Sequence, residues 1–230
     1  MTREIITFAP EAFLPAARAA FAKACGFQAG NDRHRRMSEL AEQVLEDGID
    51  SLRPTAVVSA FDSDALVGDT IRAGGFSFHC EAFAQFDPKH VRRIYAFMLA
   101  VHNIKPKQEG ISAAVFADMW GTIFCDAAIA ALTEMLRGST IIYPGFFGFS
   151  LSNILLFSKL LDGEGIGIQV REPGYTMLPV KSCCGFLFES TDPLPVPETA
   201  CRDCIANKHW CIMCKNNEKR EPGNEPLILI

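Results

Sequence analysis

Four cysteines near the carboxyl end of the chain have the spacing of a metal site. Cys201 and Cys204 form one C-x-x-C pair, and Cys211 and Cys214 form a second, with six residues between the pairs. A C-x-x-C turn directs both sulfur atoms into one hollow, so two such turns can build a tetrahedral cage of four thiolates. That donor set suits Zn2+ or an iron–sulfur cluster. The spacing predicts that these four cysteines bind a metal.

The identity of that metal stays open on spacing alone. Zinc sites of this type usually have longer spacers between their two cysteine pairs, and the cysteine run of ferredoxins is denser. An unligated redox pair is the remaining alternative. Basic residues beside the cysteines would offset the negative charge of a thiolate-bound metal, or dock an acidic electron donor. They are Lys208, Lys215, Lys219 and Arg220.

The other five cysteines need a separate explanation. The chain has nine cysteines, and an odd count argues against a complete disulfide framework. Cys25, Cys80 and Cys125 stand alone in apolar stretches and are expected to be small buried hydrophobic residues. Cys183 and Cys184 are adjacent on a predicted strand and therefore point to opposite faces of it. At most one of them can face any given site.

Composition bounds the class of protein. The chain has 230 residues, of which 49% are hydrophobic and 21% charged, enough for one sizeable core. The net charge of −5 does not indicate the basic surface that binding to a nucleic acid needs, so we expect no nucleic-acid partner. No run approaches the roughly 18–20 apolar residues that a membrane span needs, and the first residues do not resemble a secretory signal. We therefore expect a cytoplasmic protein with no membrane partner.

Hydrophobic periodicity and helix-stop residues predict helices over residues 9–27, 32–50, 110–139 and 151–168. The stretch 55–62 is rich in β-branched residues and predicts a strand, and 166–190 predicts two strands around a Pro/Gly turn. Residues 91–103 suit either a buried strand or a short helix, and 140–150 predict an irregular aromatic loop. Helices and strands do not alternate strictly, which favours an α+β fold with an antiparallel or mixed sheet.

Three segments follow from this pattern. Residues 1–190 form the folded domain. Residues 191–200 form a stiff linker, because the stretch TDPLPVPE has three prolines. Residues 201–230 form the small cysteine-rich tail.

Four stretches of residues 1–190 resemble the activation (reactivation) domain of cobalamin-dependent methionine synthase, and the stand-alone proteins built like it. They are the Ala-rich helix ADMWGTIFCDAAIAALTEML, the loop YPGFFGFSL, the helix and strand around LLDGEGIGIQV, and REPGYTMLPVKSCCGFLF. The last is similar to the family pattern T-E-S-x-x-M-x-P-x-x-S-x-x-G at Glu172, Met177, Pro179, Ser182 and Gly185. It is the most specific of the four matches.

The resemblance implies a curved antiparallel sheet with flanking helices. It also implies binding of S-adenosylmethionine against the cobalamin of a partner, in order to return the oxidised corrinoid to its active state. The acid that meets the amino group of the ligand falls at Asp126, and the loop whose backbone contacts the ligand falls at Pro144 and Gly145. Tyr143, Phe146, Phe147, Gly148 and Glu172 complete the expected cofactor-binding residues.

Two positions depart from the family pattern. Ile141 stands where the family has an arginine, which grips a carboxylate through charge-assisted hydrogen bonds worth about 1.5–3 kcal/mol each. Arg137 lies four residues upstream and is the nearest substitute. Phe146 lacks the hydroxyl of the family's aromatic residue, so stacking is retained and a hydrogen bond is lost.

The three phenylalanines of FFGF, residues 146–149, have two interpretations. One is a plug that fills the core. The other is an apolar platform for a planar ligand such as a corrin face, since aromatic rings give a large contact area at little entropic cost. Glycines beside them would let the backbone approach closely.

Two functions follow. The first is an accessory protein for reductive activation of a corrinoid methyltransferase. It would dock on the corrinoid-binding partner through the aromatic loop and pass electrons from a low-potential donor through a [4Fe–4S] cluster at the tail cysteines. The alternative is a non-catalytic module that binds a corrinoid protein and carries a structural zinc tail. The sequence leaves open whether the chain is an enzyme.

Overall fold

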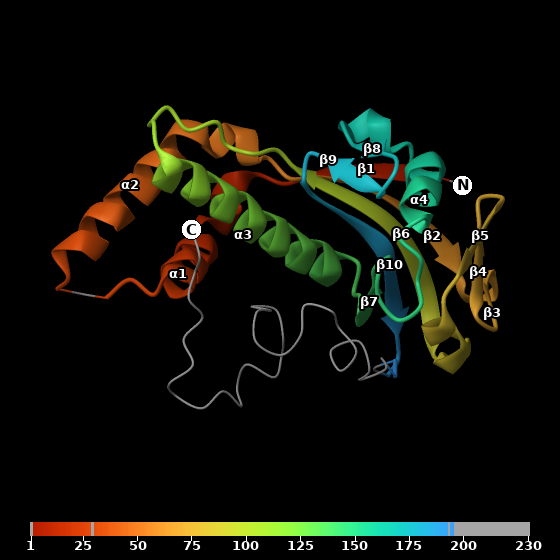
Figure 1. The fold of residues 1–230 in the computed structure, drawn as a ribbon. Helices are drawn as coiled ribbons and strands as arrows, with labels where there is room; N and C mark the ends of the chain where they lie inside the picture. Colours follow the sequence, from red (N-terminus) through yellow and green to blue (C-terminus); the bar gives the residue numbers. More distant parts are fainter. Residues whose placement is uncertain (1, 29, 193, 196–230) are drawn as a thin grey trace.

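Two long antiparallel strands, β6 (Val91–Val101) and β10 (Lys181–Ser190), form the centre of the main sheet. The structure is a computed structural model, and it describes residues 2–28, 30–192 and 194–195. The sheet has the order β1-β2-β6-β10-β7, and each neighbouring pair is antiparallel (Figure 1). The outer strands are β1 (Arg3–Thr7), β2 (Thr55–Asp62) and β7 (Thr140–Ile142).

The central strands are apolar on both faces because both faces of the sheet are covered. In β6, Ile94, Ala96 and Met98 belong to one buried cluster, and Phe97, Leu99 and Val101 belong to the other. This alternation follows from the two-residue period of a strand. A strand covered on both sides reads as a continuous apolar run, which is why the sequence of β6 does not distinguish a strand from a buried helix.

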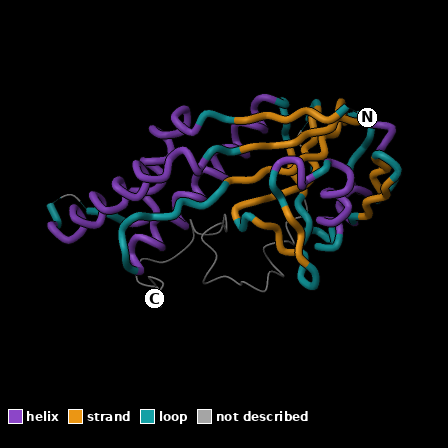
Figure 2. Tube along the Cα trace, turned by 90° about the horizontal axis from the view of Figure 1, so that it is seen from above, coloured by secondary structure: helices purple, strands orange, loops and turns teal. Residues whose placement is uncertain are grey.

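One face is covered by three helices, and we call it the helical face. The helices are α1 (Leu14–Cys25), α2 (Asp32–Gly48) and α3 (Ile111–Met135). Figures 1 and 2 show them gathered beside and beyond one end of the main sheet. Trp120 of α3 ties them together, since its Nε1 donates to the carbonyl of Ala41 in α2 at 2.9 Å and its ring stacks on Phe21 of α1 at 4.0 Å.

The helix α3 is the one described helix that is long and apolar enough to cross a bilayer by length and composition. The expectation that no stretch approaches a membrane span was therefore too strong. Packing explains its apolar composition, because α3 buries Phe116, Trp120, Phe124 and Leu132 against the sheet, α1 and α2.

The opposite face is covered by smaller elements, and we call it the aromatic face. They are α4 (Asn153–Leu161), a sheet of β3 (Leu66–Val67), β4 (Thr70–Ala73) and β5 (Phe76–His79), and a hairpin of β8 (Gln169–Arg171) and β9 (Thr176–Leu178). Phe186 of β10 lies at the centre, with its ring centroid 4.9 Å from that of Phe157 and 5.0 Å from that of Phe78. The short 3-10 helices span Pro10–Phe13, Ile49–Leu52, Ser63–Ala65, Glu81–Gln85 and Gly163–Ile166.

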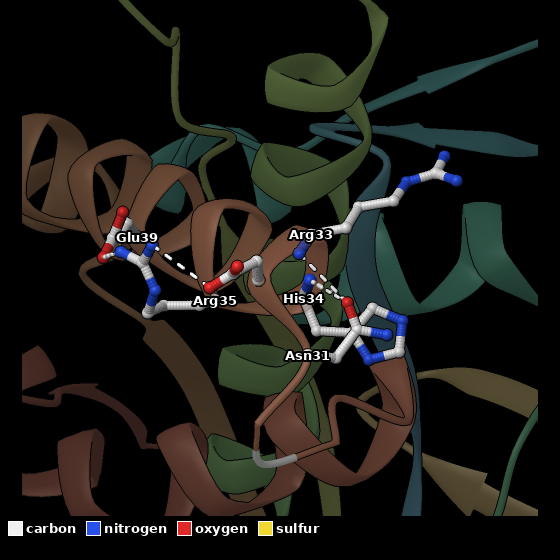
Figure 3. Close-up of polar contacts among 6 residues, drawn as sticks. Asn31, Arg33, His34, Arg35 and Glu39 are labelled. Carbon is white, nitrogen blue, oxygen red and sulfur yellow. Dashed lines mark hydrogen bonds and ion pairs between the residues drawn. The ribbon is translucent and has the colours of Figure 1, made fainter.

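The basic run at the start of α2 serves the helix itself. The side chain of Asn31 caps the helix by accepting from the backbone N–H groups of Arg33 and His34 at 3.0 and 3.3 Å, as Figure 3 shows. Arg35 pairs with Glu39 one turn later at 2.9 Å, and both side chains are exposed. Such caps and i,i+4 pairs stabilise a helix N-terminus, so these basic side chains form a solvated surface.

The α+β fold predicted from the sequence is confirmed, and every pair in the main sheet is antiparallel. The prediction missed the strands β3, β4 and β5, and it was incomplete in three further places. Residues 3–7 form an edge strand, residues 140–142 at the start of the predicted loop form β7, and residues 166–190 hold three strands rather than two. After β10, the backbone N–H of Thr191 donates to the carbonyl of His90 at 2.9 Å, and Leu194 is buried.

Two residues of the stretch that carries the family resemblance have structural roles. Ser182 donates from its hydroxyl to the carbonyl of Pro179 at 2.6 Å, which fixes the turn between β9 and β10. Gly185 lies where β7 crosses close to β10, because a Cβ built there would stand 2.5 Å from the carbonyl oxygen of Ile142. The glycine therefore allows the last strand of the main sheet to pair.

Candidate functional site

The aromatic loop, residues 143–149, links β7 to α4 and leaves the edge of the main sheet. Its backbone is fixed by internal hydrogen bonds, from Gly145 N–H to the Phe149 carbonyl at 2.6 Å and from Phe149 N–H to the Phe146 carbonyl at 2.8 Å. Gly145 and Gly148 have φ of 93° and 77°, a region that favours glycine. Phe147 adopts φ 54° without being glycine.

The two interpretations of the phenylalanines apply to different rings. Phe149 is buried and joins the cluster around Phe186, and Phe147 is partly buried against the same cluster. Phe146 is 49% exposed, and Leu151, whose side chain lies against Gly145, is 48% exposed. The loop is thus a plug on its inner side, and it presents one flat apolar ring to solvent.

Tyr143 connects this loop to the helical face. Its ring lies edge-on to Phe97 of β6 at 6.2 Å and to Phe146 at 6.5 Å. Burial raises the pKa of its hydroxyl, and nearby Cys183, Cys125 and Asp126 raise it further. The hydroxyl therefore stays protonated at neutral pH. Pro144, the next residue, is buried.

A charged group lies next to Tyr143, between α3 and β10. Asp126 on α3 is exposed, but its carboxyl loses part of its hydration to the surrounding protein, which raises its pKa, and the positive charge of Lys181 opposes that rise. Lys181, at the start of β10, has a largely buried side chain whose Nζ lies 2.8 Å from Asp118 Oδ1. The group thus contains one cation and two carboxylates.

Two thiols meet below these charges. Cys125 of α3 is buried, and Cys183 of β10 is partly buried within the same cluster on the helical face. A hydrogen bond with the Cys183 thiol, aided by Lys181, lowers the pKa of Cys125 against the effects of burial and of Asp126. The same contact and burial raise the pKa of Cys183. Cys184 belongs to the aromatic face, as the strand period predicts.

Of the residues predicted from the sequence, Asp126, Tyr143 and Phe146 come together at this place, with Pro144 and Gly145 in the same loop. Glu172 lies elsewhere. It is exposed in the turn of the β8–β9 hairpin, whose Val170, Tyr175 and Met177 pack on the aromatic face. Phe147 turns inward, and its carbonyl accepts from the Cys80 thiol at 3.3 Å, whereas Gly148 is exposed and abuts the side chain of Glu81.

Arg137 does not replace the arginine that the family pattern has at the position of Ile141. Ile141 packs against the cluster on the helical face, paired with Leu187. The helix α3 ends at Met135, two residues before Arg137. At a rise of 1.5 Å per residue, Met135 already lies about 14 Å along the helix from Asp126. Its charge acts on Tyr95, whose hydroxyl donates to Glu189 at 3.3 Å. Lys181 is the cation that acts on both Asp126 and Cys125.

The predicted metal ligands Cys201, Cys204, Cys211 and Cys214 lie outside the described residues. Within residues 2–28, 30–192 and 194–195, no group of three histidine, cysteine, aspartate or glutamate side chains is placed to hold a metal ion. A shallow hollow lies at the β4–β5 turn, residues 72–77, away from the charged group. Arg72 is the single charged residue in its lining, so the hollow lacks the paired charges of the group beside Tyr143.

The sequence predicted Cys125 to be a small buried hydrophobic residue and assigned no role to Lys181 or Asp118. The period of the predicted strand indicated only that Cys183 and Cys184 point to opposite faces. No sequence signal indicated that the face with Cys183 would meet α3 at Cys125, since the two cysteines are far apart in the chain and belong to different predicted elements.

No family model matches the chain, and no curated protein matches its sequence. Among solved structures, the chain is similar to the one described as "Crystal Structure of the MetH Reactivation Domain bound to AdoHcy". The TM-score is 0.63 at 14% sequence identity, over 85% of this chain and 81% of that chain. The chain therefore has the fold of the MetH reactivation domain.

Proposed function

We propose that the chain is an accessory protein for the reactivation of a corrinoid methyltransferase. It docks on the corrinoid-binding partner with the outer side of the aromatic loop. The observation that carries the proposal is the exposure of Phe146, whose ring lies next to Tyr143 and the charged group, with the exposed Leu151 against neighbouring Gly145, on a fold shared with a reactivation domain. Large apolar residues exposed together commonly mark an interaction surface.

The charged group supports a ligand with an amino-acid end. An ammonium group needs a carboxylate, which Asp126 offers at the surface, and a carboxylate needs a cation. Lys181 lies close enough to Asp126 to affect its pKa, and it already pairs with Asp118. We infer that S-adenosylmethionine binds here with its ammonium on Asp126 and its carboxylate near Lys181, in place of the family arginine. The solved neighbour holds AdoHcy, a ligand with the same end.

Calorimetric titration with AdoHcy tests this assignment. Lys181→Met should weaken binding by about tenfold or more, since a charge-assisted hydrogen bond contributes about 1.5–3 kcal/mol. Arg137→Met removes a cation of similar length that lies near Tyr95, and it should leave the affinity unchanged. Equal affinity of wild type and Lys181→Met would remove the lysine from the site.

Titration with cob(II)alamin, free and held by the corrinoid domain of a methionine synthase, tests the docking surface. Phe146→Ala should weaken binding to the loaded domain, because it removes the exposed ring. Phe76→Ala, on the β5 strand of the aromatic face, is the control and should bind as wild type does. Failure of the loaded domain to bind the wild-type chain at all would overturn the proposed function.

The tail cysteines extend the proposal to electron transfer. Four thiolates at Cys201, Cys204, Cys211 and Cys214 suit a [4Fe–4S] cluster. Such a cluster, when bound, supplies single electrons at potentials that reach about −700 mV, as low as cobalamin reduction needs. Electrons would reach it from a low-potential donor, for which the basic residues of the tail form the contact.

The second candidate is a non-catalytic module that binds a corrinoid protein and carries a structural zinc tail. The observation that favours it is Ile141, because a chain without the family arginine has lost a ligand contact but not a docking surface. An anaerobic assay of iron, sulfide and zinc on freshly purified protein separates the two. Iron and sulfide that are lost in Cys201→Ser support electron transfer, and one zinc per chain without iron supports the module, since zinc has no redox chemistry.

A further inference from the structure

The Cys125–Cys183 pair is a feature that the proposed function does not use. It joins the longest helix to a central strand of the main sheet, at the level of Asp126 and Tyr143. The other described cysteines differ from it. Cys184 lies on the aromatic face, Cys25 lies on α1, and Cys80 donates to a backbone carbonyl instead of another thiol.

We propose that Cys125 and Cys183 form a reversible disulfide that links α3 to β10. The disulfide closes the ligand site beside it, in the sense that the oxidised chain binds the ligand more weakly. The pairing itself rests on geometry alone. The closing of the site rests on the proposed function, because it concerns the ligand assigned to Asp126.

The close approach of α3 to β10 favours the bond. One turn before Cys125, α3 carries Gly121, and a Cβ there would stand 3.1 Å from both the Lys181 side chain and the Asn103 side chain. Two residues after Lys181, on the same face of β10, lies Cys183. The helix therefore meets the strand side chain to side chain, and Cys125 and Cys183 belong to the same packed cluster on the helical face.

The chemistry of the pair is asymmetric in a way that suits oxidation. The thiolate is the reactive form of a cysteine, and the hydrogen bond from Cys183 together with the charge of Lys181 favours the thiolate at Cys125. The raised pKa of Cys183 keeps its proton in place. Cys125 is thus suited to react with an oxidant first, and Cys183 to complete the bond.

The reaction balances with hydrogen peroxide as the oxidant. The Cys125 thiolate attacks one peroxide oxygen, the O–O bond breaks, and a sulfenic acid forms as hydroxide leaves. The Cys183 sulfur then attacks the Cys125 sulfur, the S–O bond breaks, and the hydroxyl leaves as water with the thiol proton. Overall, two thiols lose two electrons and two protons, and one peroxide becomes two waters.

Closure of the bond must alter the neighbouring site. A disulfide holds its sulfur atoms about 2.05 Å apart, closer than two hydrogen-bonded thiols. Because Cys183 is paired with Leu99 within the long β6–β10 ladder, α3 is the element that shifts. Asp126 follows Cys125 directly, and Tyr143 packs beside both thiols, so the proposed ammonium site shifts with the helix.

Peptide mapping of the full chain after peroxide treatment tests the pairing without any ligand. After free thiols are alkylated and the chain is digested without reductant, we expect one cross-linked peptide that contains Cys125 and Cys183. It should be lighter than the two thiol peptides by two hydrogen atoms and should separate on addition of dithiothreitol. In urea the cross-link should lose its preference over other cysteine pairs, because the fold no longer brings the two thiols together.

Variants sharpen the test. Cys183→Ser should abolish the cross-link and leave a sulfenic acid at Cys125, which dimedone traps, whereas Cys25→Ser should leave the cross-link intact. Independent alkylation of Cys125 and Cys183 after the peroxide treatment would overturn the proposal, and so would cross-linking of Cys183 to Cys184 or to a tail cysteine instead.

A titration of reduced and oxidised wild-type protein with AdoHcy tests the closing of the site. We expect the oxidised form to bind about tenfold more weakly, and dithiothreitol to restore the affinity. Equal affinity of both forms would refute the closing while leaving the disulfide in place. Lack of AdoHcy binding by the reduced form would instead count against the proposed function, so the two failures are distinguishable.

Discussion

The two faces of the main sheet differ in what they bury. On the aromatic face, Phe186 is surrounded by the rings of Phe78, Phe83, Phe149 and Phe157. On the helical face, the end of the sheet near the aromatic loop holds Cys125, Cys183, Lys181 and Tyr143 beside the apolar core. The comparison indicates that the aromatic face stabilises the domain, whereas the helical face combines stability with chemistry.

The strongest test of this comparison is Phe186→Ala. Removing a fully buried ring leaves a cavity, and such substitutions cost about 3–5 kcal/mol. The free energy of unfolding in urea measures the loss. Phe146→Ala is the matched control, because that ring is exposed, and it should cost less than about 1 kcal/mol. A similar loss in both variants would contradict the assignment of Phe146 to the surface.

The next largest effect is expected at Gly185, where the main sheet carries the aromatic loop. Gly185→Ala places a methyl group against the Ile142 carbonyl and should cost about 1–3 kcal/mol by displacing β7. Gly165→Ala meets only the flexible side chain of Asp162, and it should be close to neutral. Hydrogen exchange at the β7–β10 pairing should accelerate in the first variant alone.

Cys183 and Cys184 are adjacent in β10 but lie on opposite faces of the sheet, so replacing each in turn compares the two faces. Cys184→Ser buries a hydroxyl in an apolar cluster and should cost about 1–3 kcal/mol. Cys183→Ser keeps Cys125 as a hydrogen-bond partner and should cost less than about 1 kcal/mol. Urea unfolding of both variants measures the difference, and the reverse order would show that the faces are assigned wrongly.

The smallest effect concerns pH. Because partial desolvation raises the folded-state pKa of Asp126, the folded protein binds more protons than the unfolded chain near that pKa. Stability from this group is therefore present at acid pH and lost as pH rises through the raised pKa. Asp126→Asn should raise the melting temperature slightly at pH 7 and not at pH 3. A decrease at pH 7 would mean that Lys181 outweighs desolvation.

The sequence predicted the elements with a strong pattern. The helices α2 and α3 follow from their period and their stop glycines, and β2 follows from its β-branched residues. The strand β1 was missed because it is an edge strand whose side chains are mostly exposed, so it carries no buried period. The strand β7 was missed because it has only three residues. Tyr143 and Pro144, which follow it directly, are typical of a loop.

The site was predictable in part. The resemblance indicated Asp126 and the aromatic loop, and the structure brings them to one place. It did not indicate the partners of Asp126, because Lys181 and Cys183 reach it through the register between β10 and β6 and through the packing of α3 on that sheet. Register and packing are properties of the whole fold, which local patterns do not carry.

The aromatic loop is held at both ends, by β7 before Tyr143 and by the buried Phe149 ahead of α4. An approaching molecule thus meets a backbone that is already ordered. Contact would restrict little more than the rotation of the Phe146 ring, and the conformational entropy lost by an immobilised side chain is about 0.5–1.5 kcal/mol. This low entropic cost would allow a small contact area to sustain a brief, repeatable encounter.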